Sequence, residues 1–326
     1  MERLALTNAT FEGDNNAYLF ADGPETVLLD TGDWTETTRT QLRAGLSDHG
    51  VTFADVDRVL LTHWHHDHTG LAGEIQAAGG ASVHVHAADA PLVAGDEDAW
   101  RTLQKTLEER FAAWGIPEPE RATLRDAMVG VAETGLTPDV TPFEDGEAFP
   151  VGDDTLEAVH APGHAAGLCL FEPAGERDVF AGDALLPVYT PNVGGADVRV
   201  DRPLEKYLRT LDGIAGADHA RAWPGHRDPI ADPTARAEEI IHHHEERAYR
   251  VLDALAREGP CDVWTVSADL FGGLEGIHIL HGPGESYAHL EHLEAAGTVV
   301  VEDDRYRLAD GVAGDLRGRE SWPLAF

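Results

Sequence analysis

One nine-residue stretch, residues 62 to 70, constrains this chain more than any other feature. It reads Thr-His-Trp-His-His-Asp-His-Thr-Gly, and five of its side chains can ligate a metal: His63, His65, His66, Asp67 and His68. The stretch follows residues 58 to 61, Arg-Val-Leu-Leu, whose apolar run predicts a short buried strand. A buried strand that ends in a loop dense in metal ligands predicts a metal site at the end of that strand.

The spacing within the stretch indicates more than one metal position. His63 and His65 can point the same way from an extended segment, whereas Asp67 and His68 fall on the next turn and face a neighbouring position. One loop can therefore hold two cations side by side. The alternatives are a solvated histidine-rich loop and a closed structural zinc site, and the second is disfavoured because such sites prefer cysteine.

Cysteine is rare in this chain. Cys169 and Cys261 are the only two, and they lie far apart in the sequence. Two cysteines are too few for a disulfide framework, so we expect each to be a buried, reduced thiol.

The composition is strongly acidic. The 326 residues carry a formal net charge of −35, and only two of the 24 basic residues are lysines, Lys105 and Lys206. Such a composition resembles that of cytoplasmic proteins from salt-adapted halophiles, in which concentrated salt screens the self-repulsion of the surface. It also disfavours electrostatic capture of nucleic acid. No apolar run is long enough to cross a bilayer and the N-terminus lacks a secretory pattern, so we expect a cytoplasmic protein without a membrane partner.

Further residues of metal-ligand type recur at the predicted ends of strands. In chain order they are Asp30, His164, Asp183 and His226. Together with the 62 to 70 stretch, these motifs resemble the signature of the metallo-β-lactamase superfamily, in family order, over residues 30 to 226. The resemblance implies an α+β fold, namely a four-layer αβ/βα sandwich.

The same resemblance implies two metal sites that share one ligand. The implied sets are His63, His65 and His164 for the first ion, Asp67, His68 and His226 for the second, and Asp183 as the bridge. Asp30 matches a carboxylate that supports the metal loop without being a ligand. We expect two zinc ions, with iron and manganese as alternatives.

The chain divides into two predicted domains. Residues 1–232 form the catalytic domain, with a helical cap inserted at about 88–130 that faces the substrate, and a linking loop at 138–152. Residues 233–326 read as three helices followed by a hairpin that turns at residues 303–304. That order resembles the winged-helix domain attached to lactamase-like hydrolases, a family that includes mitochondrial endoribonucleases.

Two features of this tail indicate how its helices are used. The three consecutive histidines at 242–244 cannot share one helical face, which favours a solvated surface over a third metal site. The expected recognition helix, residues 285–295, has three glutamates and no lysine or arginine, so phosphates would repel it. We expect it to pack against the catalytic domain or against a second copy of the chain in a homodimer.

These features predict a dinuclear metal-dependent hydrolase with a small-molecule substrate. Two cations lower the pKa of a shared water so that hydroxide is available, and Asp67 is the catalytic candidate that orients the water and accepts a proton. The favoured substrate is a thioester or related ester, as in the glyoxalase II-like (hydroxyacylglutathione hydrolase) branch.

Three alternatives remain, the last two from other classes. One is a phosphodiesterase acting on single-stranded RNA, as in the lactamase-like endoribonucleases. Another is a non-catalytic winged-helix regulator, which would need a basic reading helix. The third is a flavodiiron-type redox protein, which would need a flavin-binding domain that the tail does not resemble.

Overall fold

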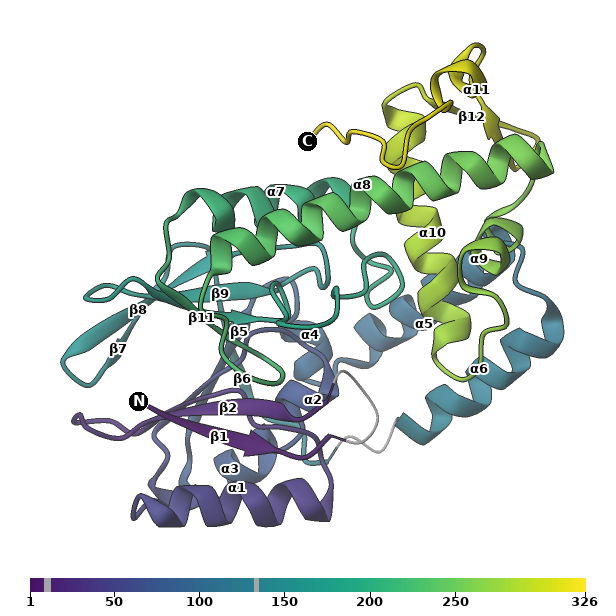
Figure 1. The fold of residues 1–326 in the computed structure, drawn as a ribbon. Coiled ribbons are helices and arrows are strands. Elements are labelled where there is room, and N and C mark those ends of the chain that lie inside the picture. The colour runs from purple at the N-terminus through teal and green to yellow at the C-terminus, as the bar shows by residue number, and fades with distance from the viewer. Residues whose placement is uncertain (9–12, 132–134) are drawn as a thin grey trace.

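Two stacked β-sheets form the centre of the computed structural model, which describes residues 1–8, 13–131 and 135–326 (Figure 1). Within these residues the first sheet has six strands in sequential order: β1 (Glu2–Leu6), β2 (Asn15–Phe20), β3 (Val27–Leu29), β4 (Arg58–Leu60), β5 (Ser82–His86) and β6 (Val140–Phe143). β1, β2 and β3 pair antiparallel, whereas β3 to β6 pair parallel. Two of the parallel strands, β3 and β4, are short and mostly apolar, Val-Leu-Leu and Arg-Val-Leu, as expected for strands covered on both faces.

The second sheet has the order β11-β10-β9-β8-β7. Its strands are β7 (Ala148–Val151), β8 (Asp154–His160), β9 (Cys169–Pro173), β10 (Asp178–Gly182) and β11 (Arg221–Pro224). β10 and β11 pair parallel, and the remaining neighbours pair antiparallel. Aromatic side chains from both sheets, including Tyr18, Phe143, Phe171 and Phe180, are buried in a common core.

Helices cover the outer faces of both sheets. α1 (Glu36–Asp48) begins at Thr35, whose side chain accepts a hydrogen bond from the backbone N–H of Thr38, and it packs with α3 (Ala72–Gly79) on the first sheet. α7 (Pro203–Gly216) and the first half of α8 (Pro233–Glu258) pack on the second sheet. The result is a mixed α+β sandwich with helices outside and sheets inside, as predicted.

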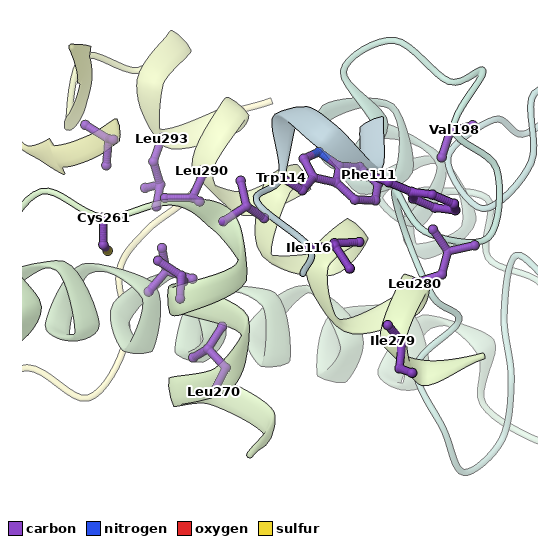
Figure 2. Close-up of a cluster of buried hydrophobic side chains, with 14 of the residues drawn as sticks. Phe111, Trp114, Ile116, Val198, Cys261, Leu270, Ile279, Leu280, Leu290 and Leu293 are labelled. Atoms are coloured by element: carbon purple, nitrogen blue, oxygen red, sulfur yellow. The ribbon is translucent and has the colours of Figure 1, made fainter. Parts of the chain in front are cut away.

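A separate hydrophobic cluster joins the inserted helices to the C-terminal helices. The helices that contribute side chains to this cluster are α5 (Glu97–Ala113), α6 (Glu118–Val131), the second half of α8, α9 (Val263–Phe271) and α10 (His278–Ala295). Figure 2 shows Phe111 and Trp114 close to Ile279, Leu280 and Leu290 of the C-terminal helices. The inserted helices therefore pack largely on the tail of the chain.

The remaining elements are short. They are the 3₁₀ turn η1 (Phe53–Asp55), α2 (His66–Thr69), α4 (Ala90–Val93), the hairpin strands β12 (Val299–Glu302) and β13 (Arg305–Leu308), and α11 (Val312–Asp315). The hairpin turns at Asp303 and Asp304, as the sequence predicts. Both residues have positive φ. Among the described residues, no helix is long and apolar enough to cross a membrane.

Two expectations from the sequence are wrong. The segment 138–152 is not a linking loop, because β6 and β7 lie within it. Pro142, Pro150 and the acidic residues of these strands and their turn occupy exposed positions beside buried Phe143 and Phe149. The histidines at 242–244 are not all solvated either. His244 is fully buried and faces α10, because α8 is covered there by the C-terminal helices.

Candidate metal centre

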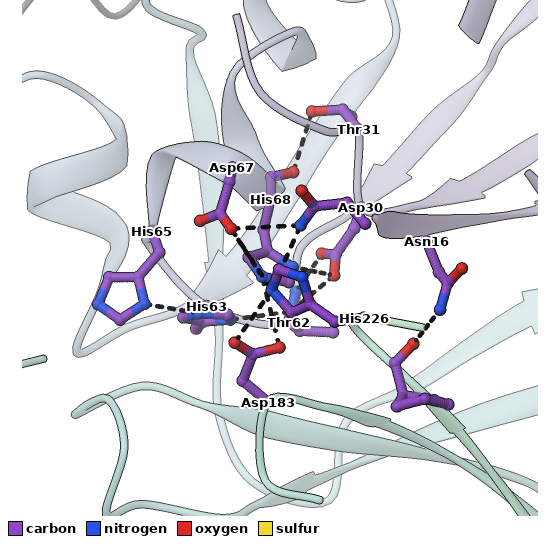
Figure 3. Close-up of polar contacts among 12 residues, drawn as sticks. Asn16, Asp30, Thr31, Thr62, His63, His65, Asp67, His68, Asp183 and His226 are labelled. Atoms are coloured by element: carbon purple, nitrogen blue, oxygen red, sulfur yellow. Dashed lines mark hydrogen bonds and ion pairs between the residues drawn. The ribbon is translucent and has the colours of Figure 1, made fainter. Parts of the chain in front are cut away.

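The seven predicted ligands lie together where strands of both sheets end. Four come from the 62 to 70 stretch, which runs from β4 through α2. The other three follow strands of the second sheet: His164 after β8, Asp183 after β10 and His226 after β11. Figure 3 shows most of these side chains pointing toward one another from their separate elements.

The first donor group consists of His63, His65 and His164. His65 Nδ1 lies 2.9 Å from His63 Nε2 and 3.1 Å from His164 Nε2. Ligand atoms around a tetrahedral zinc ion with bonds of about 2.0–2.1 Å stand roughly 3.3 Å apart. The three nitrogens therefore have the spacing of ligands to one cation.

The second donor group consists of Asp67, His68 and His226. Asp67 Oδ2 lies 3.4 Å from His226 Nε2 and 3.9 Å from His68 Nε2. These donor atoms also form a buried set of the size that a metal ion requires. His66 belongs to neither group; its Nε2 lies 4.0 Å from Asp33 Oδ1.

Asp183 lies between the two groups. Its Oδ2 is 3.7 Å from His164 Nε2 and 3.4 Å from His226 Nε2, and its Oδ1 is 3.5 Å from His68 Nε2. The approach depends on Gly225, because a Cβ there would stand 2.3 Å from Asp183 Oδ1. One carboxylate thus faces histidines of both groups, as a shared ligand would.

Hydrogen bonds orient the rings of the first group. The ring nitrogen that does not face the centre lies 3.0 Å from Thr62 Oγ1 in His63, 3.1 Å from the Ala196 carbonyl in His65 and 2.9 Å from the Asn192 carbonyl in His164. A carbonyl can only accept, so the outer nitrogens of His65 and His164 carry the protons and the inner nitrogens keep their lone pairs.

The second group is oriented from the N-terminal part of the chain. Asp30 Oδ2 lies 2.9 Å from His68 Nδ1, and the Gly13 carbonyl lies 3.0 Å from His226 Nδ1. Asp67 Oδ2 accepts hydrogen bonds from the side chains of Asn8 and Asn15 at 3.1 and 3.3 Å. Both asparagines lie more than 50 positions before Asp67 in the sequence, so these contacts join distant segments at one carboxylate.

Asp30 lies where the sequence resemblance expects a supporting carboxylate. It is buried with a positive φ of 58°, and besides His68 it accepts hydrogen bonds from the backbone N–H and hydroxyl of Thr62 at 2.8 Å. An aspartate tolerates the left-handed region better than most residues. Asp30 therefore ties the end of β3 to the start of the metal loop.

Several supporting groups were missed by sequence reasoning. They are Asn8, Asn15, the Gly13 carbonyl and the carbonyls of Asn192 and Ala196. Backbone carbonyls carry no residue-type signal, so no motif could have identified them. Asn8 and Asn15 offered only the weak signal of polar residues next to an apolar strand.

Two imidazoles of the first group, His63 and His65, are neutral in the absence of metal. Burial, reinforced by the neighbouring imidazoles, lowers the pKa of His63 well below its usual value and that of His65 to about 3. Both rings therefore stay unprotonated at neutral pH and can offer lone pairs to a cation.

The second group has the opposite tendency. Burial alone would lower the pKa of both histidines, but Asp183 and Asp67 outweigh it, raising the pKa of His68 well above its usual value and that of His226 to about 9. Burial would likewise raise the pKa of the carboxylates, yet the two imidazoles lower that of Asp67 to about 2 and that of Asp183 well below its usual value. The metal-free second group therefore pairs imidazolium with carboxylate.

A network of ion pairs surrounds Trp64, the residue between His63 and His65 in the sequence. The Arg199 guanidinium lies 2.6 Å from both Asp89 and Asp197 and stacks over the Trp64 ring at 5.2 Å. Asp89 accepts a hydrogen bond from the Trp64 backbone, and Asp197 accepts one from its indole N–H. The network fixes the backbone on which His63 and His65 are carried.

A cavity of about 390 Å³ lies apart from this centre, between β8, β9 and α7. Its lining includes His160, Lys206, Arg209 and Thr210, and none of the seven donors contributes to it. His160 stacks on His86 with ring centroids 4.2 Å apart.

Residues 10–226 match the family model described as the metallo-beta-lactamase superfamily. The match covers well over half of the chain and includes all seven donors. The chain belongs to the metallo-β-lactamase superfamily. Its relatives and its donor groups show it to be a metallo-hydrolase of this fold with a metal-binding centre.

Relatives of similar length support this assignment. A metallo-beta-lactamase family protein from Thermus thermophilus is 32% identical, with a TM-score of 0.81 over 94% of this chain and 98% of its own. The probable metallo-hydrolase YqjP of Bacillus subtilis is 29% identical over 87% of this chain and 88% of its own.

Fungal relatives match over part of their length only. The lactamase-like protein vrtG of Penicillium aethiopicum is 28% identical over 74% of this chain and 60% of its own. The thioesterase pkgB of Emericella nidulans is 27% identical over 73% of this chain and 54% of its own. The chain thus spans little more than half of the length of these curated relatives.

Proposed function

We propose that this protein is a dinuclear metal-dependent hydrolase that cleaves a small acyl substrate, a thioester or related ester. The observation that carries the proposal is the pair of donor groups joined by the Asp183 carboxylate. His63, His65 and His164 would hold the first ion, Asp67, His68 and His226 the second, and Asp183 both.

The donor atoms themselves favour a metal. Within the described part of the chain, His68 Nε2 and Asp183 Oδ1 are buried and have no hydrogen-bond partner. The two atoms face each other at 3.5 Å, and ligation of a metal ion would give each the close partner that it lacks. A donor set of imidazole nitrogens and carboxylate oxygens suits zinc, and iron or manganese would also accept it.

When bound, the two cations would supply Lewis acidity and lower the pKa of water in the centre. The protein supplies the orientation. Its outer hydrogen bonds fix the rings so that each inner nitrogen faces the centre, and His63 and His65, which are neutral, need no deprotonation before they can bind a cation.

Asp67 is the proposed proton-handling group. Its Oδ2 is held by Asn8 and Asn15, and the carboxylate stays ionised at neutral pH because His68 and His226 overcome the effect of burial. Such a fixed, ionised carboxylate can orient an attacking water and accept its proton.

The substrate class rests on relatives and on charge. One relative carries the name thioesterase, and several others are named lactamase-like. An acyl substrate fits both names, since each describes attack on a carbonyl. A hydroxyacylglutathione hydrolase-like activity is the specific form that we favour.

Hydrolysis of single-stranded RNA is the second candidate. The same donor set would serve a phosphodiester, but a net charge of −35 would repel a polyanion. A winged-helix regulator is weaker still, because the candidate reading helix within α10 is mostly internal: Glu285, Ser286, His289 and Leu290 are all buried. The packing of α10 on the rest of the molecule was expected from its acidic sequence.

A substrate panel in molar potassium chloride tests the proposal. The metal-free protein, reloaded separately with zinc, iron and manganese, is assayed on a thioester, a lactone, a cephalosporin, bis-nitrophenyl phosphate and single-stranded RNA. We expect metal-dependent turnover to be highest on the thioester. Turnover confined to the phosphodiesters would favour the second candidate, and failure of the wild-type protein to bind two metal ions would overturn the proposal.

A further inference from the structure

The loop at residues 192–197 supports two ligands of the first group at once. The Asn192 carbonyl accepts from the outer nitrogen of His164 and the Ala196 carbonyl accepts from that of His65. The side chain of Asn192 closes the loop, since its Oδ1 accepts from the backbone N–H groups of Gly195 and Ala196 at 3.1 and 2.8 Å. Two histidines from distant motifs therefore depend on one loop conformation.

Helix α10 of the tail holds this loop through Glu285. Glu285 Oε2 accepts hydrogen bonds from the Asn192 side chain at 3.2 Å and from the Val193 backbone N–H at 3.1 Å. The Asn192 side chain also donates to the His281 carbonyl at 3.1 Å. Because Glu285 is only 3% exposed, these bonds form away from water.

The backbones of the loop and the helix are in direct contact. A Cβ added at Gly284 would lie 2.3 Å from the Cα of Gly195, and one added at Gly194 would lie 2.6 Å from the Gly284 carbonyl oxygen. Glycines on both sides thus allow Glu285 to reach the loop without an intervening side chain.

A residue of α8 holds the other carboxylate oxygen of Glu285. Its Oε1 accepts a hydrogen bond from Arg247 at 2.7 Å, next to His244 and His289, whose facing nitrogens lie 3.2 Å apart. These three side chains, His244, Glu285 and His289, are spaced closely enough for a metal ion. Arg247 already supplies the positive charge there, and the two imidazoles pair with each other. We therefore infer that this cluster anchors the Glu285 side chain rather than binding a metal ion.

We propose that Glu285 is a positioning residue for the first metal ion, acting through the 192–197 loop on His65 and His164. The proposal rests on the dinuclear centre proposed above. Outer hydrogen bonds set the orientation and basicity of metal-ligating histidines, and losing one commonly weakens metal binding by about 10–100-fold. The tail of the chain is therefore part of the metal centre, and its influence falls on the first site.

The two sites can be tested separately in single-site backgrounds. His226→Ala removes a second-site ligand and leaves the first group whole, whereas His164→Ala does the reverse. Into each background we would introduce Glu285→Ala, Glu285→Gln or the control Glu291→Ala. Glu291 lies on the same helix, and its carboxylate accepts from Tyr287 rather than from the loop. Affinity is measured by titrating the metal-free proteins with Co²⁺ and following visible absorption.

We expect Glu285→Ala to weaken Co²⁺ binding about 10-fold or more in the first-site background and to leave the second-site background near its parent. Glu285→Gln keeps an oxygen for Asn192 and Val193 but loses the ion pair with Arg247. It should therefore lower the melting temperature while retaining first-site affinity. Glu291→Ala should change neither affinity.

Should Glu285→Ala fail to fold, Asn192→Asp provides the same test. It keeps the acceptor that closes the loop, loses the donor to Glu285 and places two carboxylates face to face. Unchanged first-site affinity in these variants would overturn the proposal, as would an equal loss in both backgrounds. Either result would leave the dinuclear hydrolase intact provided that the wild-type protein binds two ions.

Discussion

The two halves of the metal centre are supported by opposite ends of the chain. The first donor group is oriented by the 192–197 loop, which is held in turn by α10 of the tail. The second is oriented by Asp30, by the Gly13 carbonyl and by two asparagines near the N-terminus. Only Asp183 and the 62 to 70 stretch belong to both.

The halves also differ in chemistry. Carbonyl acceptors orient His65 and His164 of the first group, and its His63 and His65 stay neutral without metal. Carboxylates instead surround the histidines of the second group and keep them protonated. A ligand sphere that looks symmetric in sequence, with two residues from one loop on each side, is therefore asymmetric in its supports. Variants outside the ligand set should affect one ion and spare the other.

Removing the shared carboxylate should have the largest effect, because it breaks both halves at once. We expect Asp183→Ala to lower kcat/KM by roughly 10³-fold or more, the equivalent of about 4 kcal/mol, while circular dichroism shows an intact fold. Asp178→Ala is the matched control, since Asp178 lies on the same strand and accepts a hydrogen bond from Trp223 outside the centre. Turnover near that of the control would remove Asp183 from the proposed mechanism.

Asp30→Asn should weaken the second metal site more than the first, because Asp30 supports the second group from the N-terminal part of the chain. Asparagine tolerates the positive φ of this position, but the charge that supports His68 is lost. We expect second-site metal affinity to fall about 10–100-fold and first-site affinity to fall less, measured by Co²⁺ titration in the single-site backgrounds. Asp57→Asn is the control, because Asp57 lies just before β4, at the end of that strand away from the metal loop, and accepts a hydrogen bond from the Thr26 backbone N–H. Equal losses at both sites would contradict the separate supports.

The pH dependence of the metal-free protein should report the second group. The folded-state pKa of His68 is raised and that of His226 is raised to about 9, so their protonation stabilises the fold below about pH 6.5. This stabilisation is lost as pH rises through the raised pKa values. We expect the melting temperature of the metal-free protein to fall by several degrees between pH 7 and 9. The fall should shrink in His226→Ala; a profile identical to wild type would argue against this pairing.

Salt should have the smallest influence on the difference between the halves. The acidic surface predicts that the free energy of unfolding falls when potassium chloride is reduced from molar to dilute concentration. The donor side chains are buried except for that of His65, which is half-buried, so the ratio of first-site to second-site affinity should change little. A melting temperature indifferent to salt would refute the halophile-type interpretation of the composition.

The sequence was most informative where chemistry and strand pattern coincide. The ligand-rich stretch after an apolar strand predicted the location of the centre, and the order of Asp30, His164, Asp183 and His226 predicted which strands lead into it. Three helices and the hairpin at residues 303–304 were also expected in the tail. These features depend on local residue patterns, which a single sequence displays directly.

What the sequence could not predict are contacts between distant segments. Glu285 looked like one of three glutamates on an acidic helix, yet it is buried and reaches the loop beside His164. His244 looked solvated because three adjacent histidines point in different directions, and α10 covers that one direction. The charged segment at 138–152 looked like a loop although alternate side chains, Phe149 among them, reach the core.

The glycine contact between Gly284 and Gly195 limits how this protein can be engineered. Because no methyl group fits between the two backbones, a foreign tail with alanine at that place would have to stand farther from the loop. Exchanging C-terminal segments among relatives as interchangeable cassettes, or trimming the chain to its sandwich to obtain a minimal enzyme, should therefore cost metal retention even where the shortened protein remains well folded.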